Sequence, residues 1–235
     1  MVPGQLVPDT TMTLAPLYGL VLGGGGSRRM KRNKSALHYH GKPQLEHAFD
    51  LLTPHCERTF LSIRKDQEAE YAQFPQIHDT PTFPGPLNGI LSAMIRFPDA
   101  AWCVLANDLP YVDTHAIQML IQHRTVGKVA VAFRNPQKSF PEPLCTIYEP
   151  AMQAHLMTFM EAGGFIFRKA LEGVELQLLE PPHELTLFNV NFPEEYRNVL
   201  ENLVNEQHER NVSERTVQES LIPPGGDAYA AERIA

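Results

Sequence analysis

Short apolar runs alternate with amphipathic stretches along most of the chain. The apolar runs predict strands at residues 17–22, 59–63, 101–106, 128–133, 144–148 and 174–179. Helical spacing of apolar residues predicts helices at 43–52, 87–96, 114–123, after Pro150 and at 193–204. A regular exchange of strand and helix signals is typical of a three-layer α/β/α sandwich.

The first strand predicts how the sheet is built. Leu17 to Leu22 is a continuous apolar run, as expected of a strand that is buried on both faces. We therefore expect a Rossmann-like, mostly parallel sheet. It would belong to one domain at 17–204, with a flexible, proline-containing leader at 1–16 and a polar tail at 205–235.

The length and the net charge of the chain exclude several classes of protein. A chain of 235 residues can bury the core of one sizeable domain. A net charge of −7 argues against a general nucleic-acid or anionic-membrane surface, because such surfaces are basic. No run approaches the roughly 18 apolar residues of a membrane span, and the 3 cysteines are widely spaced. We therefore expect a cytoplasmic protein with reduced thiols.

A glycine run follows the first predicted strand. Gly23 to Gly26 precede Arg28 and Lys34, and ligands of open parallel sheets bind beyond the carboxyl ends of the strands. Glycines let a ligand approach backbone N–H groups, and basic side chains suit phosphates. The P-loop pattern does not fit, because Asn33 stands where that motif has glycine. Taken alone, the run could also be a flexible turn beside a solvated basic face.

A second polar position follows the apolar run at 101–106. There Asp108 lies at the end of a predicted strand, and Pro110 closes the turn. One carboxylate together with substrate phosphates is enough to bind Mg²⁺. An aspartate here could instead cap a helix that begins near Thr114.

The glycine run is part of a longer resemblance. Residues 22–34 read L-G-G-G-G-S-R-R-M-K-R-N-K and resemble the L-A-G-G-x-S-x-R-M-G-x-D-K signature of MobA-like nucleotidyltransferases, the family of molybdenum cofactor guanylyltransferase. The resemblance implies a fold of the nucleotide-diphospho-sugar transferase type. It also implies that the nucleotide is bound by Leu22, Gly23, Gly24, Gly25, Arg28 and Lys34, with Lys34 on the phosphates as a catalytic residue.

Two further stretches resemble motifs of the same family. Residues 107–110 resemble its C-D-x-P motif, which implies that Asp108 is the catalytic magnesium ligand. Asp79 and residues 85–89 resemble the D-x-x-x-x-G-P-L-x-G stretch that frames the nucleobase, which implies roles for Asp79, Gly85 and Gly89. Asp79 could accept hydrogen bonds from guanine or from ribose hydroxyls. A proline-rich loop before a helix would explain the second stretch equally well.

Two later stretches resemble the acceptor side of the family. Residues 140–145 are similar to its P-L-C/A strand, and residues 188–195 to its N-I-N-T-P-E-D/E stretch. The second match implies that Asn189 and Asn191 contact the acceptor. Ordinary turn chemistry before a proline-initiated helix explains these asparagines about as well.

The resemblance implies a Mg²⁺-dependent transfer of GMP from GTP to the phosphate of molybdopterin, with release of pyrophosphate. GTP, a molybdopterin-type acceptor and other molybdenum cofactor proteins are the implied partners. Departures at Lys31, Asn33, Asn107 and Phe192 leave open a different phosphorylated acceptor, with CTP or GTP. A nucleotide-binding protein with little catalysis, whose tail engages a partner, is a third hypothesis.

Overall fold

A computed structural model describes residues 13–23, 37–80, 85–138, 140–164, 166–190, 192 and 194–203. Within these ranges the strands form one seven-stranded sheet in the order β3-β2-β1-β4-β6-β5-β7. The strands are β1 (Leu17–Leu22), β2 (Arg58–Ile63), β3 (Gln76–His78), β4 (Ala101–Ala106), β5 (Ala130–Arg134), β6 (Pro141–Tyr148) and β7 (Leu176–Leu179). Only β6 runs antiparallel to its neighbours, β4 and β5, so the prediction of a mostly parallel sheet is confirmed.

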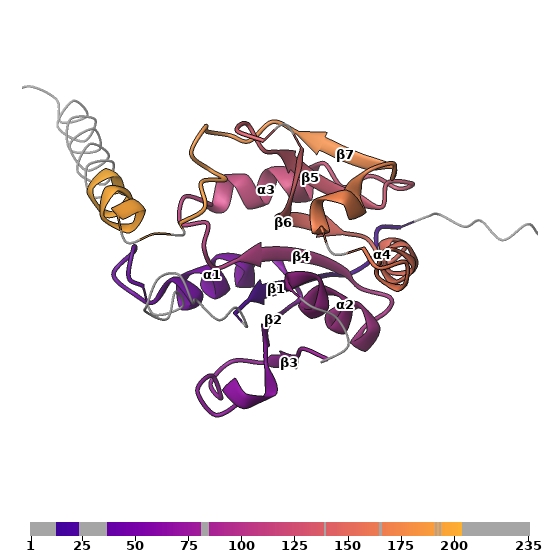
Figure 1. Ribbon diagram of the computed structural model, residues 1–235, viewed down its shortest axis with the longest axis horizontal. Coiled ribbons are helices and arrows are strands. Elements are labelled where there is room, and N and C mark those ends of the chain that lie inside the picture. The colour runs from indigo at the N-terminus through magenta and orange to yellow at the C-terminus, as the bar shows by residue number, and fades with distance from the viewer. Residues whose placement is uncertain are drawn as a thin grey trace, which may run out of the picture. The chain divides into compact units, whose positions relative to one another are not determined.

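Helices cover both faces of this sheet (Figure 1). The α-helices are α1 (Gln44–Leu52), α2 (Pro86–Arg96), α3 (Thr114–Gln122) and α4 (Met152–Glu161), and short 3-10 helices span Thr53–His55, Lys65–Gln67 and Phe167–Leu171. Side chains of α1 and α3 belong to one buried cluster, and those of α2 and α4 to another. Successive strand residues alternate between the two, as Leu20 and Val21 do. The three-layer α/β/α sandwich is therefore confirmed.

Local sequence explains where two of the helices begin. Gly85, with φ of 78°, precedes α2, and Pro86 occupies the first helical position, where a missing N–H is harmless. Asp113 caps α3, because its Oδ1 accepts a 2.9 Å hydrogen bond from the amide of Ala116.

The predicted elements are present, with shifted ends. The strand expected at 144–148 begins at Pro141 instead, and the short edge strand β3 was not predicted. Proline lacks an amide donor, which explains why the prediction began after Pro143. The predicted tail at 205–235 and most of the predicted leader lie outside the described residues.

The chain divides into two compact units, with the boundary after Asn191. In the second unit residues 194–203 are helical, close to the expected 193–204. The carboxylate of Glu195 accepts a 3.0 Å hydrogen bond from the amide of Phe192 at the start of this helix. Among the helices that the structure describes, none has the length and apolar character that crossing a membrane requires.

Candidate active site

The register of the sheet brings the predicted site segments to one edge. Leu22, the last residue of β1, pairs with Ala106 of β4 on one side and with Ser62 of β2 on the other. The residues that follow these parallel strands therefore emerge side by side. This is the point where the strand order changes direction, and open α/β sheets bind ligands there.

Gly23 lies directly after β1, where buried leucine side chains leave little room for a larger residue. Its amide donates a 2.9 Å hydrogen bond to the carbonyl of Ser62. A Cβ atom at this position would lie 2.8 Å from Cδ1 of Leu45 and 2.9 Å from Cδ1 of Leu61, closer than carbon atoms approach. Gly24, Gly25, Arg28 and Lys34, which were predicted to bind the nucleotide, lie outside the described residues.

Asp79 follows β3 and faces the end of β2. Its Oδ1 accepts a 2.6 Å hydrogen bond from the hydroxyl of Ser62. Burial raises the pKa of this carboxyl, and the hydrogen bond from Ser62 partly offsets the rise. Since Oδ2 accepts no hydrogen bond from the described residues, it can accept one from a ligand.

Gly85 and Gly89 place the first turn of α2 against this pair. A Cβ atom at Gly89 would lie 2.1 Å from the Ser62 hydroxyl oxygen and 3.1 Å from Oδ1 of Asp79. The glycine therefore lets the helix approach the two side chains. The positive φ of Gly85 favours glycine there as well. The residues that resemble the nucleobase-framing motif, Asp79, Gly85 and Gly89, are thus closely packed together at the start of α2.

The segment after β3 is fixed to α2 by hydrogen bonds. The amide of Thr80 donates to the Ser92 hydroxyl over 3.0 Å, and the Thr80 hydroxyl donates to Oδ1 of Asn88 over 3.1 Å. The side-chain amide of Asn88 also donates to the carbonyl of Thr80. These bonds hold Asp79, the preceding residue, in a defined position.

Asp108 follows β4, as predicted, and does not cap a helix. Asp113 fills that role for α3, so the alternative reading of Asp108 as a cap is wrong. The Asp108 carbonyl accepts a 3.0 Å hydrogen bond from the amide of Val190, and Oδ1 is shielded from solvent. Leu109, 2% exposed, anchors the segment in the core.

Glu142 is a second carboxylate at this position, and the sequence analysis did not single it out. The antiparallel pairing of β4 with β6 reaches Leu105 and Cys145, so it brings the residues just before Cys145, Glu142 among them, toward the segment that follows β4. Burial is the main cause that raises the pKa of Glu142, and the negative charge of Asp108 adds to the rise. The Asn135 side chain donates a 2.9 Å hydrogen bond to Oε2 of Glu142 and holds it there.

One member of a stacked histidine pair is hydrogen-bonded to the Asp108 segment. Nε2–H of His40 donates a 3.0 Å hydrogen bond to the carbonyl of Pro110. The His40 ring stacks on that of His47 in α1, with the ring centres 3.8 Å apart. Burial and the neighbouring His40 lower the pKa of His47 to about 4, so this ring is neutral at pH 7. His40 is a positioning residue that the sequence pattern did not reveal.

Asn189 lies next to the Asp108 segment, because Val190, which follows it, donates to the Asp108 carbonyl. Oδ1 of Asn189 is shielded from solvent and accepts no hydrogen bond from the described residues. A buried oxygen that lacks a hydrogen-bond donor destabilises the folded state, so a ligand or an ion that binds this oxygen would relieve the cost. Asn191, the other predicted acceptor contact, lies outside the described residues.

The residues around Asp108 fit a hard divalent cation. Carboxylate and side-chain amide oxygens are the donors that Mg²⁺ accepts, and Asp108, Glu142 and Asn189 supply them. A cation would also reduce the repulsion between the two carboxylates. The described part of the chain has no cluster of three or more His, Cys, Asp or Glu residues, so a dedicated protein cage is absent from it. Mg²⁺ that also binds substrate phosphates needs no such cage.

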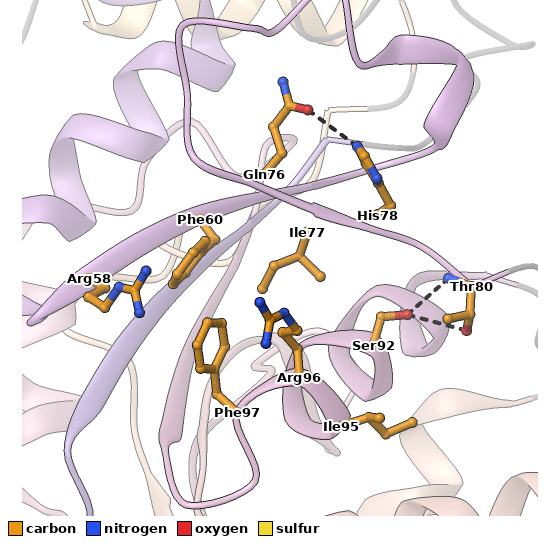
Figure 2. A pocket seen from close by; sticks show the side chains of 10 residues that line it. All are labelled: Arg58, Phe60, Gln76, Ile77, His78, Thr80, Ser92, Ile95, Arg96 and Phe97. Carbon is orange, nitrogen blue, oxygen red and sulfur yellow. Dashed lines mark hydrogen bonds between the residues drawn. The ribbon is translucent and has the colours of Figure 1, made fainter.

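A cavity lies away from this edge (Figure 2). It runs along α2 beside β2 and β3, and none of the predicted site residues lines it. Thr80, which neighbours Asp79, lines one end, and Arg58, at the amino end of β2, lines the other. The cavity is therefore separate from the segments that meet at the carboxyl ends of β1 and β4.

A family profile and similar sequences indicate one family for this chain. A family profile described as MobA-like NTP transferase domain matches residues 19–178, a range that ends before Asn189. A molybdenum cofactor biosynthesis bifunctional protein of Synechocystis sp. is 35% identical over 183 residues. The match covers 77% of this chain and 53% of that protein, so the chain spans about half of its length.

Two further relatives match along nearly their whole length. A molybdenum cofactor guanylyltransferase of Pseudomonas putida is 30% identical over 193 residues, which is 80% of this chain and 98% of that protein. A crystal structure of molybdopterin-guanine dinucleotide biosynthesis protein A from Archaeoglobus fulgidus has a TM-score of 0.68 at 22% identity. It covers 80% of this chain and 99% of the other, and supports the fold.

Proposed function

This chain belongs to the MobA-like NTP transferase family and is a nucleotidyltransferase, and from this premise we propose that it transfers GMP from GTP to the phosphate of molybdopterin-bound molybdenum cofactor. An oxygen of the acceptor phosphate attacks the α-phosphorus of GTP. The bond from the α-phosphorus to the oxygen shared with the β-phosphate breaks, and pyrophosphate leaves with the electron pair of that bond.

The observation that carries the proposal is the meeting of strand ends at one edge of the sheet. The register Leu22–Ala106 sets the residue that opens the glycine run, Gly23, beside the segment that holds Asp108. A triphosphate bound by the first segment would thus lie next to the carboxylate of the second. Alignment of the two reactants and neutralisation of charge account for most catalysis of phosphoryl-type transfers, so no acid/base pair is required.

We assign a magnesium site to Asp108, with Glu142 and Asn189 beside it. The arrangement of buried oxygen atoms supports this assignment. When bound, Mg²⁺ supplies positive charge to the triphosphate and to the departing pyrophosphate. The chain's own residues set the position: Val190 and His40 donate hydrogen bonds to the carbonyls of Asp108 and Pro110, and so hold the backbone at Asp108 and just after it.

The nucleotide contacts are proposed at two places. Asp79 presents Oδ2 to guanine or to ribose hydroxyls, and its geometry with Ser62 supports this role. The glycines and the side chains of Arg28 and Lys34 would hold the phosphates, and here the support is the sequence resemblance. GTP is preferred over CTP in the proposal because two relatives that match over 98% of their own length are named as guanylyltransferases, one of them as a probable one.

Thermal unfolding with each of GTP, CTP, ATP and UTP, with and without Mg²⁺, tests the proposal. GTP with Mg²⁺ should raise Tm the most, because a ligand at about 100 times its Kd stabilises the folded state by about 2.7 kcal/mol. Asp108→Asn should lose the part of the shift that depends on Mg²⁺. The matched control is Asp99→Asn, an exposed carboxyl in the turn before β4, which should keep it. A larger shift with CTP would contradict the choice of nucleotide.

A further inference from the structure

The cavity along α2 has the size of a small-molecule site. Its volume is about 520 Å³, within the range of roughly 300–1,000 Å³ that ligand pockets occupy. Residues of β2, β3 and the second half of α2 line it, together with Phe97 just after the helix (Figure 2). Its far end lies at the start of β2, whereas the candidate active site lies beyond the carboxyl ends of β1 and β4.

Two arginines give this cavity its charge. The guanidinium carbons of Arg58 and Arg96 each lie 5.1 Å from the centre of the Phe97 ring, on opposite sides of it in Figure 2. The Arg58 group also lies 4.9 Å from the centre of the Phe60 ring. Stacking on the rings orients both groups without using their N–H donors.

Neither arginine is neutralised by the described part of the chain. No carboxylate there lies within 4.0 Å of the guanidinium nitrogens of Arg58 or Arg96. No Asp or Glu lines the cavity. Both arginines are exposed, and two guanidinium groups without a carboxylate partner among the described residues, beside apolar walls, favour an anion over a cation.

The remaining walls are apolar or already hydrogen-bonded. Phe60 and Ile77 are buried behind the cavity, and Ile95 is 50% exposed at its rim. The Ser92 hydroxyl donates to the Asn88 carbonyl over 2.8 Å and accepts from the amide of Thr80, so it is occupied within the protein. A ligand would therefore find anion-binding groups in the arginines and an apolar surface elsewhere.

We propose that this cavity is a second binding site, which takes a small organic anion with a flat apolar body. Its phosphate, sulfate or carboxylate group pairs with the guanidinium of one of the two arginines, on one side of the Phe97 ring, and the body packs against Phe97, Phe60 and Ile95. Arginine forks match the oxygen geometry of such anions. The proposal does not depend on the proposed function, because no residue assigned to nucleotide or cation binding lines the cavity.

The test uses 1-naphthyl phosphate as the probe, with the full-length chain in a calorimetric titration. We expect saturable binding with Kd below about 1 mM, as its number of atoms allows. Inorganic phosphate and 1-naphthol, which each carry half of the probe's chemistry, should bind at least about 10-fold more weakly. A titration without saturable binding of the probe would overturn the proposal.

Variants assign the binding to this cavity. The double variant Arg58→Gln with Arg96→Gln should bind the probe about 10-fold or more weakly than the parent. Ile95→Glu, at an exposed position that leaves the arginines in place, should do the same by repelling the anion. Arg168→Gln is the matched control, since Arg168 also stacks on an aromatic ring, 5.2 Å from the centre of Phe140. Unchanged affinity in the first two variants, or an equal loss in the control, would place the probe elsewhere and overturn the proposal.

Discussion

Asp79 is proposed to contact the nucleotide, and its buried negative charge destabilises the fold. Burial raises the pKa of its carboxyl, so the folded state disfavours the charged form. Asp79→Asn keeps an oxygen for Ser62 and removes the charge. We expect the variant to bind GTP about 10-fold more weakly, because a hydrogen bond to a charged group is lost. The unfolding free energy at pH 7 should rise by less than about 1 kcal/mol, because the half-buried carboxyl is screened by solvent.

The stability gained by Asp79→Asn should depend on pH. A carboxyl whose folded pKa is raised stabilises the fold below the unfolded pKa, and this stabilisation is lost as the pH rises through the folded pKa. The advantage of Asp79→Asn in Tm should therefore shrink as the pH falls from 7. Asp66→Asn is the opposite control, because the hydrogen bond with Arg64 lowers the pKa of Asp66. An advantage of Asp79→Asn that does not change with pH would contradict the argument.

Single residues were predictable from the sequence where they belong to a family motif. Asp79 and Asp108 could be chosen because each lies beside a motif, and the structure places them at the same edge of the sheet. Glu142 and His40 could not be chosen. Glu142 reaches Asp108 through the antiparallel register of β6, and His40 through a hydrogen bond to Pro110, 70 residues away in sequence.

The start of α3 provides a prediction at the scale of one element. Asp113→Ala removes the hydrogen bond to the amide of Ala116 and should lower the unfolding free energy by about 1 kcal/mol. Nucleotidyl transfer should persist at temperatures where the variant is folded. Asp113→Ser, which retains a cap, should recover most of the stability. A loss of Mg²⁺-dependent transfer in Asp113→Ala would mean that the roles of Asp108 and Asp113 are not separate.

Helices and strands with a long apolar run or a clear apolar period were predicted, and the short strand β3 was missed. The apolar strands β1 and β4 have their expected bounds. β3 has three residues, too few to show any period, and it lies at the edge of the sheet. β6 begins before Pro143, next to a break in the register with β5 between Ala132 and Arg134, where a missing amide donor is tolerated.

At the scale of the first compact unit, one buried arginine joins segments that are far apart in sequence. The Arg124 guanidinium donates to both carboxylate oxygens of Glu149, over 2.7 and 3.0 Å, and to the carbonyl of Ala15 over 2.8 Å. The two charged side chains are 6% and 10% exposed. The ends of α3 and β6 and the residues before β1 are therefore held together by one side chain.

Removal of this arginine should destabilise the unit strongly. We expect Arg124→Met to cost about 3–5 kcal/mol in denaturant unfolding, because Glu149 remains buried without its partner. Arg124→Lys should lie between the parent and Arg124→Met, since lysine keeps the charge without the fork of donors. Arg134→Gln breaks an exposed pair with Glu180 and should cost about 1 kcal/mol or less. Equal costs for Arg124→Met and Arg134→Gln would contradict this account.

The general arrangement of the sheet followed from the alternation of apolar runs, but the direction of β6 did not. A short apolar run does not by itself tell whether it pairs parallel or antiparallel. The direction of β6 is instead required by the short connection between Arg134 and Pro141, which is too short for a parallel crossover. That single reversal brings Glu142, which lies just before Cys145, toward the segment after β4 and so contributes it to the proposed cation site. The cavity that Arg58 and Arg96 flank was also beyond the sequence, because α2 meets β2 and β3 only in the folded chain.

The central claim is that GMP is transferred from GTP to molybdopterin-bound molybdenum cofactor. GTP with a radioactive α-phosphate tests it, because the label shows where the GMP goes. In the presence of Mg²⁺ and the acceptor, the account predicts that label moves to the acceptor, with one pyrophosphate released for each transfer. It predicts little transfer from CTP and a loss of about 100-fold or more with Asp108→Asn. Transfer from CTP in preference to GTP, or label that never reaches the acceptor, would contradict the account.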